Sequence, residues 1–115
     1  MARFPGEATK GSTTGRPVMV LLDALGKRWT LRIIWELNKE APCTFRDLRA
    51  RCDEVSPTSL NQRLKDLSEL GLIKRTSLGY SLTDYGRSLS QLLLPFDRWA
   101  ADWANWLSKD LTERE

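Results

Sequence analysis

The segment 56–70, SPTSLNQRLKDLSEL, carries polar and basic side chains of the types that hydrogen-bond to the edges of DNA bases. Glutamine and asparagine pair with adenine, lysine and arginine pair with guanine, and serine and threonine contact several base groups. This chemistry predicts recognition of double-stranded DNA, and an ordinary solvated helix surface is the alternative. The residues of the segment that we expect at the DNA are Ser56, Thr58, Ser59, Asn61, Gln62, Arg63 and Lys65.

The spacing of the leucines predicts that these polar residues share one side of a helix. At roughly 100° per residue, one face carries Leu60, Leu64, Leu67 and Leu70. The opposite side carries Thr58, Gln62, Lys65 and Glu69, with Ser59 and Asn61 at its flanks and Arg63 beside the apolar edge. A recognition helix enters the major groove with its N-terminal part first. We therefore expect base contacts from Thr58, Ser59, Gln62 and Arg63, and a phosphate contact from Lys65.

Basic residues outside this segment are candidates for holding the DNA backbone. Lys74 and Arg75 precede a predicted turn, where they could contact phosphates or the minor groove. Three more lie at the starts of neighbouring predicted helices, where free backbone N–H groups favour anions: Lys27, Arg28 and Arg46. Together these contacts predict an affinity that falls steeply as salt is raised.

The composition excludes several other kinds of site. The sequence has no histidine, which excludes histidine-based catalysis and histidine-ligated metals. Its two cysteines cannot build a four-ligand thiolate site, and the sequence contains no glycine-rich phosphate loop and no Ser/His or Cys/His pairing. We therefore expect no enzyme, no metal site and no cofactor.

The two cysteines, Cys43 and Cys52, lie at the two ends of a predicted helix, 44–52. Helical geometry separates them by about 13 Å, whereas a disulfide requires Cα atoms within about 7 Å. We therefore expect both to fill the core as free thiols rather than to form a redox pair.

Length and charge indicate one small domain with a basic middle. The chain has 115 residues, 41% of them hydrophobic, which suits a single small core. Residues 26–82 carry eleven Lys and Arg against seven Asp and Glu, whereas residues 83–115 carry four against six. A basic middle favours a polyanionic partner. No apolar run approaches the roughly 18 residues of a membrane span, so we expect no membrane partner and a cytoplasmic location.

Helix and turn signals place the DNA-reading segment in a larger pattern. Residues 1–15 predict a flexible arm, and residues 16–115 the domain. Helices are predicted at 17–25, which is apolar on nearly every side, and at 28–40. Helices at 44–52 and 56–70, capped by Thr44 and Ser56 and joined by residues 53–55, predict a helix-turn-helix. Strands at 72–76 and 80–83 add a small wing.

Residues 84–111 predict one long helix that Pro95 kinks or divides. Its apolar residues alternate steps of three and four, the period of a coiled-coil seam. This seam and the apolar helix at about 16–25 need a partner chain to cover them, and we expect a homodimer. The predicted interface residues are Val18, Met19, Leu21, Leu22, Leu92, Phe96, Trp99, Trp103 and Trp106.

Four stretches of the chain carry a recognisable family pattern. They contain Pro17-Val18 to Lys27-Arg28-Trp29-Thr30, Phe45-Arg46-Asp47-Leu48, Ser56-Pro57 to Gly71-Leu72-Ile73, and Tyr80-Ser81-Leu82-Thr83 with Gly86. Across about residues 16–107, the pattern resembles that of HxlR-type transcription regulators, a branch of the MarR-like winged helix group. The resemblance implies a cytoplasmic homodimer that binds operator DNA and dimerises through its first and last helices.

The sequence departs from that family pattern in two places. Many members carry a cysteine just before the Pro-Val pair, and some use it to sense oxidants or electrophiles, but Arg16 stands there in this chain. The usual wing also has a longer tip than Thr76 to Gly79. The resemblance therefore does not extend to thiol sensing at position 16 or to deep insertion of the wing.

Taken together, the sequence predicts a mainly α fold with a small β-hairpin, a winged helix-turn-helix that dimerises through its N- and C-terminal helices. Its expected function is sequence-specific transcriptional regulation, with repression at a pseudo-palindromic operator as the default. The short wing and the tryptophan-rich end motivate an alternative, a protein–protein interaction module without DNA binding. A small-molecule effector stays open as a further partner, although no polar residue set points to its pocket.

Overall fold

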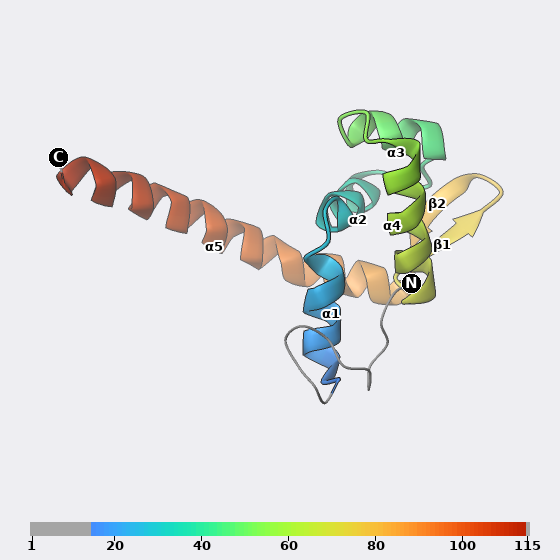
Figure 1. Ribbon diagram of the computed structural model, residues 1–115, viewed down its shortest axis with the longest axis horizontal. Coiled ribbons are helices and arrows are strands. Elements are labelled where there is room, and N and C mark those ends of the chain that lie inside the picture. The colour runs from blue at the N-terminus through green and yellow to red at the C-terminus, as the bar shows by residue number, and fades with distance from the viewer. Residues whose placement is uncertain (1–14, 115) are drawn as a thin grey trace.

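The computed structural model describes residues 15–114, and most of the predicted arm at 1–15 lies outside them. The elements follow the order α1 (Pro17–Leu25), α2 (Thr30–Lys39), α3 (Phe45–Arg51), α4 (Pro57–Glu69), β1 (Ile73–Thr76), β2 (Gly79–Leu82) and α5 (Asp84–Arg114). The second, third and fourth helices gather with the hairpin into one body, and α5 leaves that body as a long lone arm (Figure 1). The described chain is elongated, measuring 55 × 37 × 26 Å.

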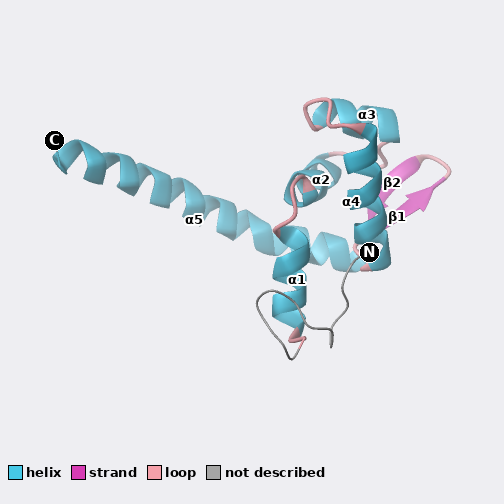
Figure 2. Cartoon of the chain, viewed as in Figure 1, coloured by secondary structure: helices cyan, strands magenta, loops and turns pink. Residues whose placement is uncertain are grey.

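The fold is the predicted one, mainly α with a single small hairpin, which supplies the only strands of the described chain (Figure 2). Strands β1 and β2 pair antiparallel, from Ile73 opposite Leu82 to Thr76 opposite Gly79. Ser77 and Leu78 form the turn between them. Both strands lie within one residue of their predicted bounds, and the hairpin directly after α4 completes a winged helix-turn-helix.

Three side-chain caps fix where the helices begin. The hydroxyl oxygens of Thr44, Ser56 and Thr83 each accept a hydrogen bond, at 3.1 Å, from a backbone N–H three residues later. Each bond satisfies an N–H that the first turn of a helix leaves without a partner. The predicted starts of α3, α4 and α5 are therefore confirmed at the level of individual atoms.

The core lies where α2, α3, α4 and the hairpin meet. Burial of these apolar side chains supplies the main stabilising free energy of the body. The core members include Ile33, Ile34, Leu37, Cys43, Leu48, Cys52, Val55, Leu60, Leu64, Leu67, Ile73 and Leu82. Leu89 and Leu93 of α5 pack against this cluster, so the first part of α5 belongs to the body.

One predicted helix bound is wrong, and one expected break does not occur. The second helix begins at Thr30 rather than at residue 28, because Trp29 has a left-handed backbone (φ 77°) that no helix accommodates. The last helix is one long helix, as predicted, and of the two effects expected of Pro95 the division does not occur, because the helix runs unbroken from Asp84 to Arg114. Pro95 and Gln91, whose carbonyl loses its N–H partner, both lie on exposed surface, where water can replace the missing hydrogen bond.

Gly86 sits where the start of α5 crosses the end of α4, and it allows the sharpest prediction about the fold. A Cβ atom at this position would overlap the carbonyl oxygen of Leu72. We expect Gly86→Ala to lower the free energy of unfolding by about 1–3 kcal/mol, the usual cost of overpacking. Urea denaturation followed by circular dichroism measures this difference.

Gly71→Asn is the matched control for that experiment. Gly71 has a positive φ of 73° and no atom within 4 Å of the site of a Cβ, and asparagine tolerates this backbone conformation. Its midpoint should stay closer to that of the wild type. Equal midpoints for Gly86→Ala and the wild type would contradict the overlap.

Candidate nucleic-acid interface

α4 and its N-cap residue present polar side chains to solvent. Ser56, Thr58, Ser59, Asn61 and Lys65 are all exposed, while Leu60 and Leu64 of the same helix are buried. The helix period therefore separates a polar side from an apolar side, as the leucine spacing predicts. This exposed side is the surface that we call the reading face, defined by those five residues.

The turn between α3 and α4 has an unusual backbone. Asp53 and Glu54, two consecutive residues that are not glycine, both have left-handed conformations, with φ of 55° and 57°. Such conformations cost of order 1 kcal/mol or more each. The turn therefore depends on contacts with its surroundings, and two arginines supply them.

Arg32 of α2 holds the first half of the turn. Its Nη2 donates to the carbonyl oxygen of Arg51 at 2.6 Å, and its Nη1 lies 3.3 Å from a carboxylate oxygen of Asp53. Its Nε donates to Glu36 at 2.9 Å, and this hydrogen bond is the largest cause of the raised pKa of Arg32. A cation at the last carbonyls of α3 also complements the helix dipole.

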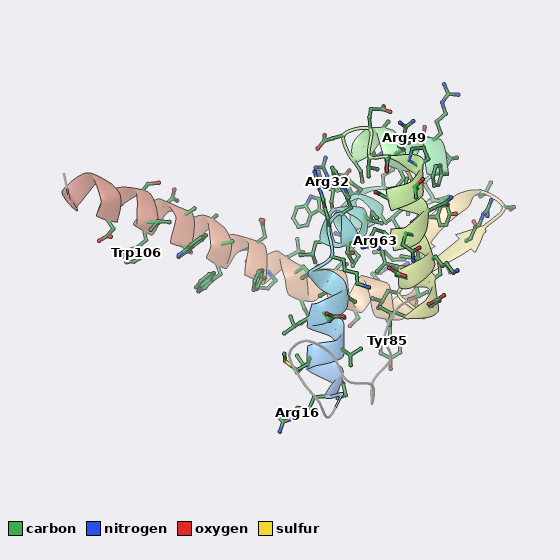
Figure 3. The ribbon with its side chains drawn as sticks, viewed as in Figure 1. Arg16, Arg32, Arg49, Arg63, Tyr85 and Trp106 are labelled. Atoms are coloured by element: carbon green, nitrogen blue, oxygen red, sulfur yellow. The ribbon has the colours of Figure 1, made fainter. Side chains whose placement is uncertain are left out.

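Arg49 of α3 holds the second half of the turn in the same manner. Its Nε donates to the carbonyl oxygen of Val55 at 2.7 Å, and its Nη1 lies 3.6 Å from a carboxylate oxygen of Glu54. Each left-handed residue thus has its carboxylate paired with an arginine, and each arginine also binds a flanking carbonyl. Figure 3 labels both arginines on the body of the molecule, away from the α5 arm.

Two of the four predicted base readers have partners inside the protein. Gln62 Nε2 donates to Asp66 Oδ1 at 2.9 Å, and Arg63 Nη2 lies 3.4 Å from Asp66 Oδ2. Both residues are half-buried, unlike Thr58 and Ser59. Their contact with bases stays a prediction, whereas the more exposed Thr58, Ser59 and Asn61 are immediately available to a ligand.

Four of the outlying basic residues lie on other parts of the chain and are exposed. Arg46 is exposed in the first turn of α3, and Lys74 and Arg75 are exposed on β1. Aromatic rings support two of these guanidinium groups: Arg28 lies 5.3 Å from the centre of the Trp29 ring, and Arg75 lies 5.7 Å from that of Tyr80. Cation–π contacts of this kind hold a long side chain while leaving its charge available.

Three residues of the site were not predicted from the sequence: Arg32, Arg49 and Asp66. The missed pattern is partly local, because Gln62 and Arg63 stand four and three residues before Asp66, the spacing of neighbours on one helix face. Arg32 has no comparable local signal towards the turn, because 21 residues separate it from Asp53.

Both cysteines are free and buried, as predicted. Cys43 and Tyr80 form an antiparallel bridge in which each N–H donates to the other's carbonyl, at 2.9 and 2.8 Å. Burial raises the pKa of the Cys43 thiol and that of the Cys52 thiol. In the described part of the chain, no group of three or more His, Cys, Asp or Glu could hold a metal, and no helix is long and apolar enough to cross a membrane.

A wing, a capped helix pair and an exposed polar reading face define a winged helix-turn-helix DNA-binding protein. A family model described as HxlR-like helix-turn-helix matches residues 24–108. The HTH-type transcriptional regulator YvaP of Bacillus subtilis is 33% identical over 89 residues, which cover 71% of this chain and 82% of that protein. The HTH-type transcriptional regulator BH0655 of Halalkalibacterium halodurans is 28% identical over 106 residues, or 86% of this chain and 92% of that one.

A solved structure gives the same result. The crystal structure of quinone-bound YodB from B. subtilis matches with a TM-score of 0.65 at 30% identity, covering 71% of this chain and 91% of that chain. The chain belongs to the HxlR-like helix-turn-helix family, and it is a DNA-binding transcriptional regulator.

Burial of both thiols predicts that they react slowly in the folded protein. Because their pKa values are raised, the reactive thiolate is scarce at pH 7. Mass spectrometry after brief treatment with iodoacetamide should find neither cysteine alkylated in the folded protein. In guanidinium chloride, where both become accessible, both should be alkylated. Rapid labelling of either cysteine without denaturant would contradict their buried placement.

Proposed function

We propose that the protein is a homodimeric repressor that binds a pseudo-palindromic operator. In this proposal, α4 of each copy enters one of two successive major grooves, about 34 Å apart. The observation that carries the proposal is the exposed reading face on α4 and its N-cap, free of cover from the described chain. Repression follows if the occupied operator overlaps a promoter.

The apolar surface of α5 supports the dimer. Its exposed fractions are 69% for Leu92, 66% for Phe96, 49% for Trp103 and 61% for Trp106. Trp99 and Trp103 stack with ring centres 6.3 Å apart, so they present one continuous aromatic surface. Figure 3 shows Trp106 on the lone arm of the helix. A second copy would remove this surface from water, which is favourable in proportion to the area buried.

The first helix offers a second apolar surface for the same purpose. Val18 and Leu22 are more than half exposed. A single chain therefore does not bury every apolar side of α1. Met19 is partly buried, and Leu21 packs partly against the core. We therefore assign Val18 and Leu22 to the centre of the α1 contribution, with Met19 and Leu21 at its border.

A small organic effector is a further partner that we propose. The support is that YodB, a structural relative, is known with quinone bound. A ligand cannot form an adduct with a thiol at the position before the Pro-Val pair of this chain, because that residue is Arg16. An apolar groove of about 400 Å³ between α2 and α5, with walls that include Trp35 and Phe96, has room for a ligand of that size.

The alternative function, an interaction module without DNA binding, keeps two observations in its favour. The wing turn holds only Ser77 and Leu78, and the tryptophans of α5 are exposed. Electrophoretic shift with random genomic fragments at low and at moderate salt separates the two functions. A shift at low salt that weakens at moderate salt supports DNA binding. No shift at either salt would favour the interaction module.

Selection of bound fragments from a genomic library is the experiment that tests the proposal directly. We expect enrichment of sites with two inverted half-sites about one helical turn apart. A single conserved half-site, or no enrichment, would contradict a dimer that reads two grooves. Fragments from promoter regions would support repression.

The reading face generates a prediction about sequence preference. Thr58→Ala together with Asn61→Ala should remove most discrimination between the operator and random DNA, because base contacts carry that difference. Lys65→Ala should instead weaken binding to both DNAs alike and reduce the salt slope by about 1. Fluorescence anisotropy titrations over a range of salt concentrations measure both effects. Full discrimination in the double variant would rule out these residues as base readers.

The aromatic surface of α5 generates a prediction about assembly. Trp103→Asp should give monomers in sedimentation velocity, because dimerisation would bury an unpaired carboxylate. Tyr85→Asp is the matched control: Tyr85 is also an exposed aromatic residue of α5, at 81%, but lies outside the predicted interface, and this variant should stay dimeric. An unchanged dimer for Trp103→Asp would refute the assigned interface.

A further inference from the structure

The helix that carries the reading face, α4, also contains a buried carboxylate. Asp66 lies in α4, and its side chain is only 7% exposed. A buried carboxylate is costly unless cations or hydrogen bonds compensate for the lost hydration. The Asp66 carboxylate therefore depends on nearby cations and hydrogen-bond donors. The elements that supply these groups are the ones that the carboxylate links together.

Two partners of Asp66 lie on its own helix and one does not. Gln62 and Arg63 approach from α4, whereas Lys27 Nζ lies 3.9 Å from Asp66 Oδ2 and belongs to the connection between α1 and α2. The backbone N–H of Lys27 donates to the carbonyl of Ala24 at 3.3 Å, and its carbonyl accepts from the N–H of Thr30 at 3.2 Å. Lys27 is therefore fixed to the end of α1 and to the start of α2.

The contact with Lys27 is electrostatic rather than a directional hydrogen bond. Asp66 Oδ2 and Arg63 Nε are both buried without a hydrogen-bond partner among the described residues. Attraction between the carboxylate and the cations of Lys27 and Arg63 is what holds Oδ2 in place. Because burial weakens screening by solvent, such an attraction is stronger than the same pair at the surface.

We propose that Asp66 is a positioning residue that fixes the separation of the two reading helices in the dimer. The chain of contacts runs from α4 through Asp66 and Lys27 to α1, whose exposed Leu22 belongs to the proposed dimer surface. Each α4 is thereby tied to the two-fold interface. This inference rests on the proposed function, because half-site spacing has meaning only for a dimer on two half-sites.

Spacing of the half-sites is the readout that tests this role. One inserted base pair moves a half-site by about 3.4 Å and rotates it by about 35°. We expect the wild type to lose about tenfold or more in affinity for an operator lengthened or shortened by one base pair. Asp66→Asn keeps an acceptor for Gln62 but has no negative charge to attract Lys27. When the operator is lengthened or shortened by one base pair, the affinity of this variant should fall by less than about threefold.

Variants of Lys27 make the test independent of the stability of Asp66→Asn. Lys27→Met removes the link to α1 and leaves Gln62 and Arg63 on Asp66, so it should tolerate altered spacing as Asp66→Asn does. Because affinities are compared between spacings within one variant, the loss of a phosphate contact from Lys27 affects every spacing alike and does not change this readout. Lys27→Arg keeps the cation and should discriminate between operator spacings as sharply as the wild type does. Glu40→Gln is the matched control. Glu40 is exposed and also ion-paired, to Arg51 at 3.0 Å, but this pair joins the end of α2 to α3 and includes neither α4 nor Lys27. The variant should behave as the wild type.

The outcomes separate this inference from the proposed function. Each variant is first checked for folding by circular dichroism and for dimerisation by sedimentation velocity. A wild type that is monomeric, or that binds single half-sites, would refute the proposed function itself. A wild type that discriminates spacing, together with folded, dimeric Lys27→Met and Asp66→Asn proteins that discriminate as sharply, would overturn the role of Asp66.

Discussion

The turn between α3 and α4 is the constraint on which the DNA-binding surface depends. Asp53 and Glu54 both have left-handed backbones, a conformation that residues with a Cβ avoid. Arg32 and Arg49 each pair with one of the two carboxylates and bind a neighbouring carbonyl. Because one of these arginines comes from α2 and the other from α3, the angle between α3 and α4 is fixed by the body of the domain and not by the turn alone.

Local signals were sufficient to predict the helix starts and the side of α4 that faces solvent. A capping hydroxyl and the N–H it binds lie three residues apart, and the leucine spacing repeats within one helix, so both can be read without knowledge of the fold. The start of α2 at Thr30 and the absence of a division at Pro95 are the two features that local signals did not predict. The left-handed backbone of Trp29 and the unbroken helix at Pro95 depend on the environment of those residues, which no local pattern encodes.

The same limit applies to the candidate site. Gln62 was predicted at a base edge because its residue type suits adenine, but its amide nitrogen also suits the carboxylate of Asp66. Residue type and helix position alone could not distinguish these partners. The contact of Lys27 with Asp66 could not be predicted from a local pattern, because only the tertiary fold brings the connection between α1 and α2 close to α4.

The long last helix serves two purposes along its length. Near its start, Leu89 and Leu93 complete the core of the body. From Phe96 onward, its phenylalanine and tryptophan side chains are exposed, and beyond the groove that α5 forms with α2 the helix extends away from the body (Figure 1). One continuous α-helix joins these two parts, so in the proposed dimer the surface that meets a second copy and the residues that complete the core belong to the same element.

The bridge between Cys43 and Tyr80 extends the two-stranded hairpin sideways into the segment that precedes α3. Gly79 makes this approach feasible, since any Cβ there would collide with the backbone of Cys43. The wing is consequently no independent flap. The backbone bridge therefore ties the hairpin that carries Lys74 and Arg75 to the segment directly before α3, whose first turn carries Arg46.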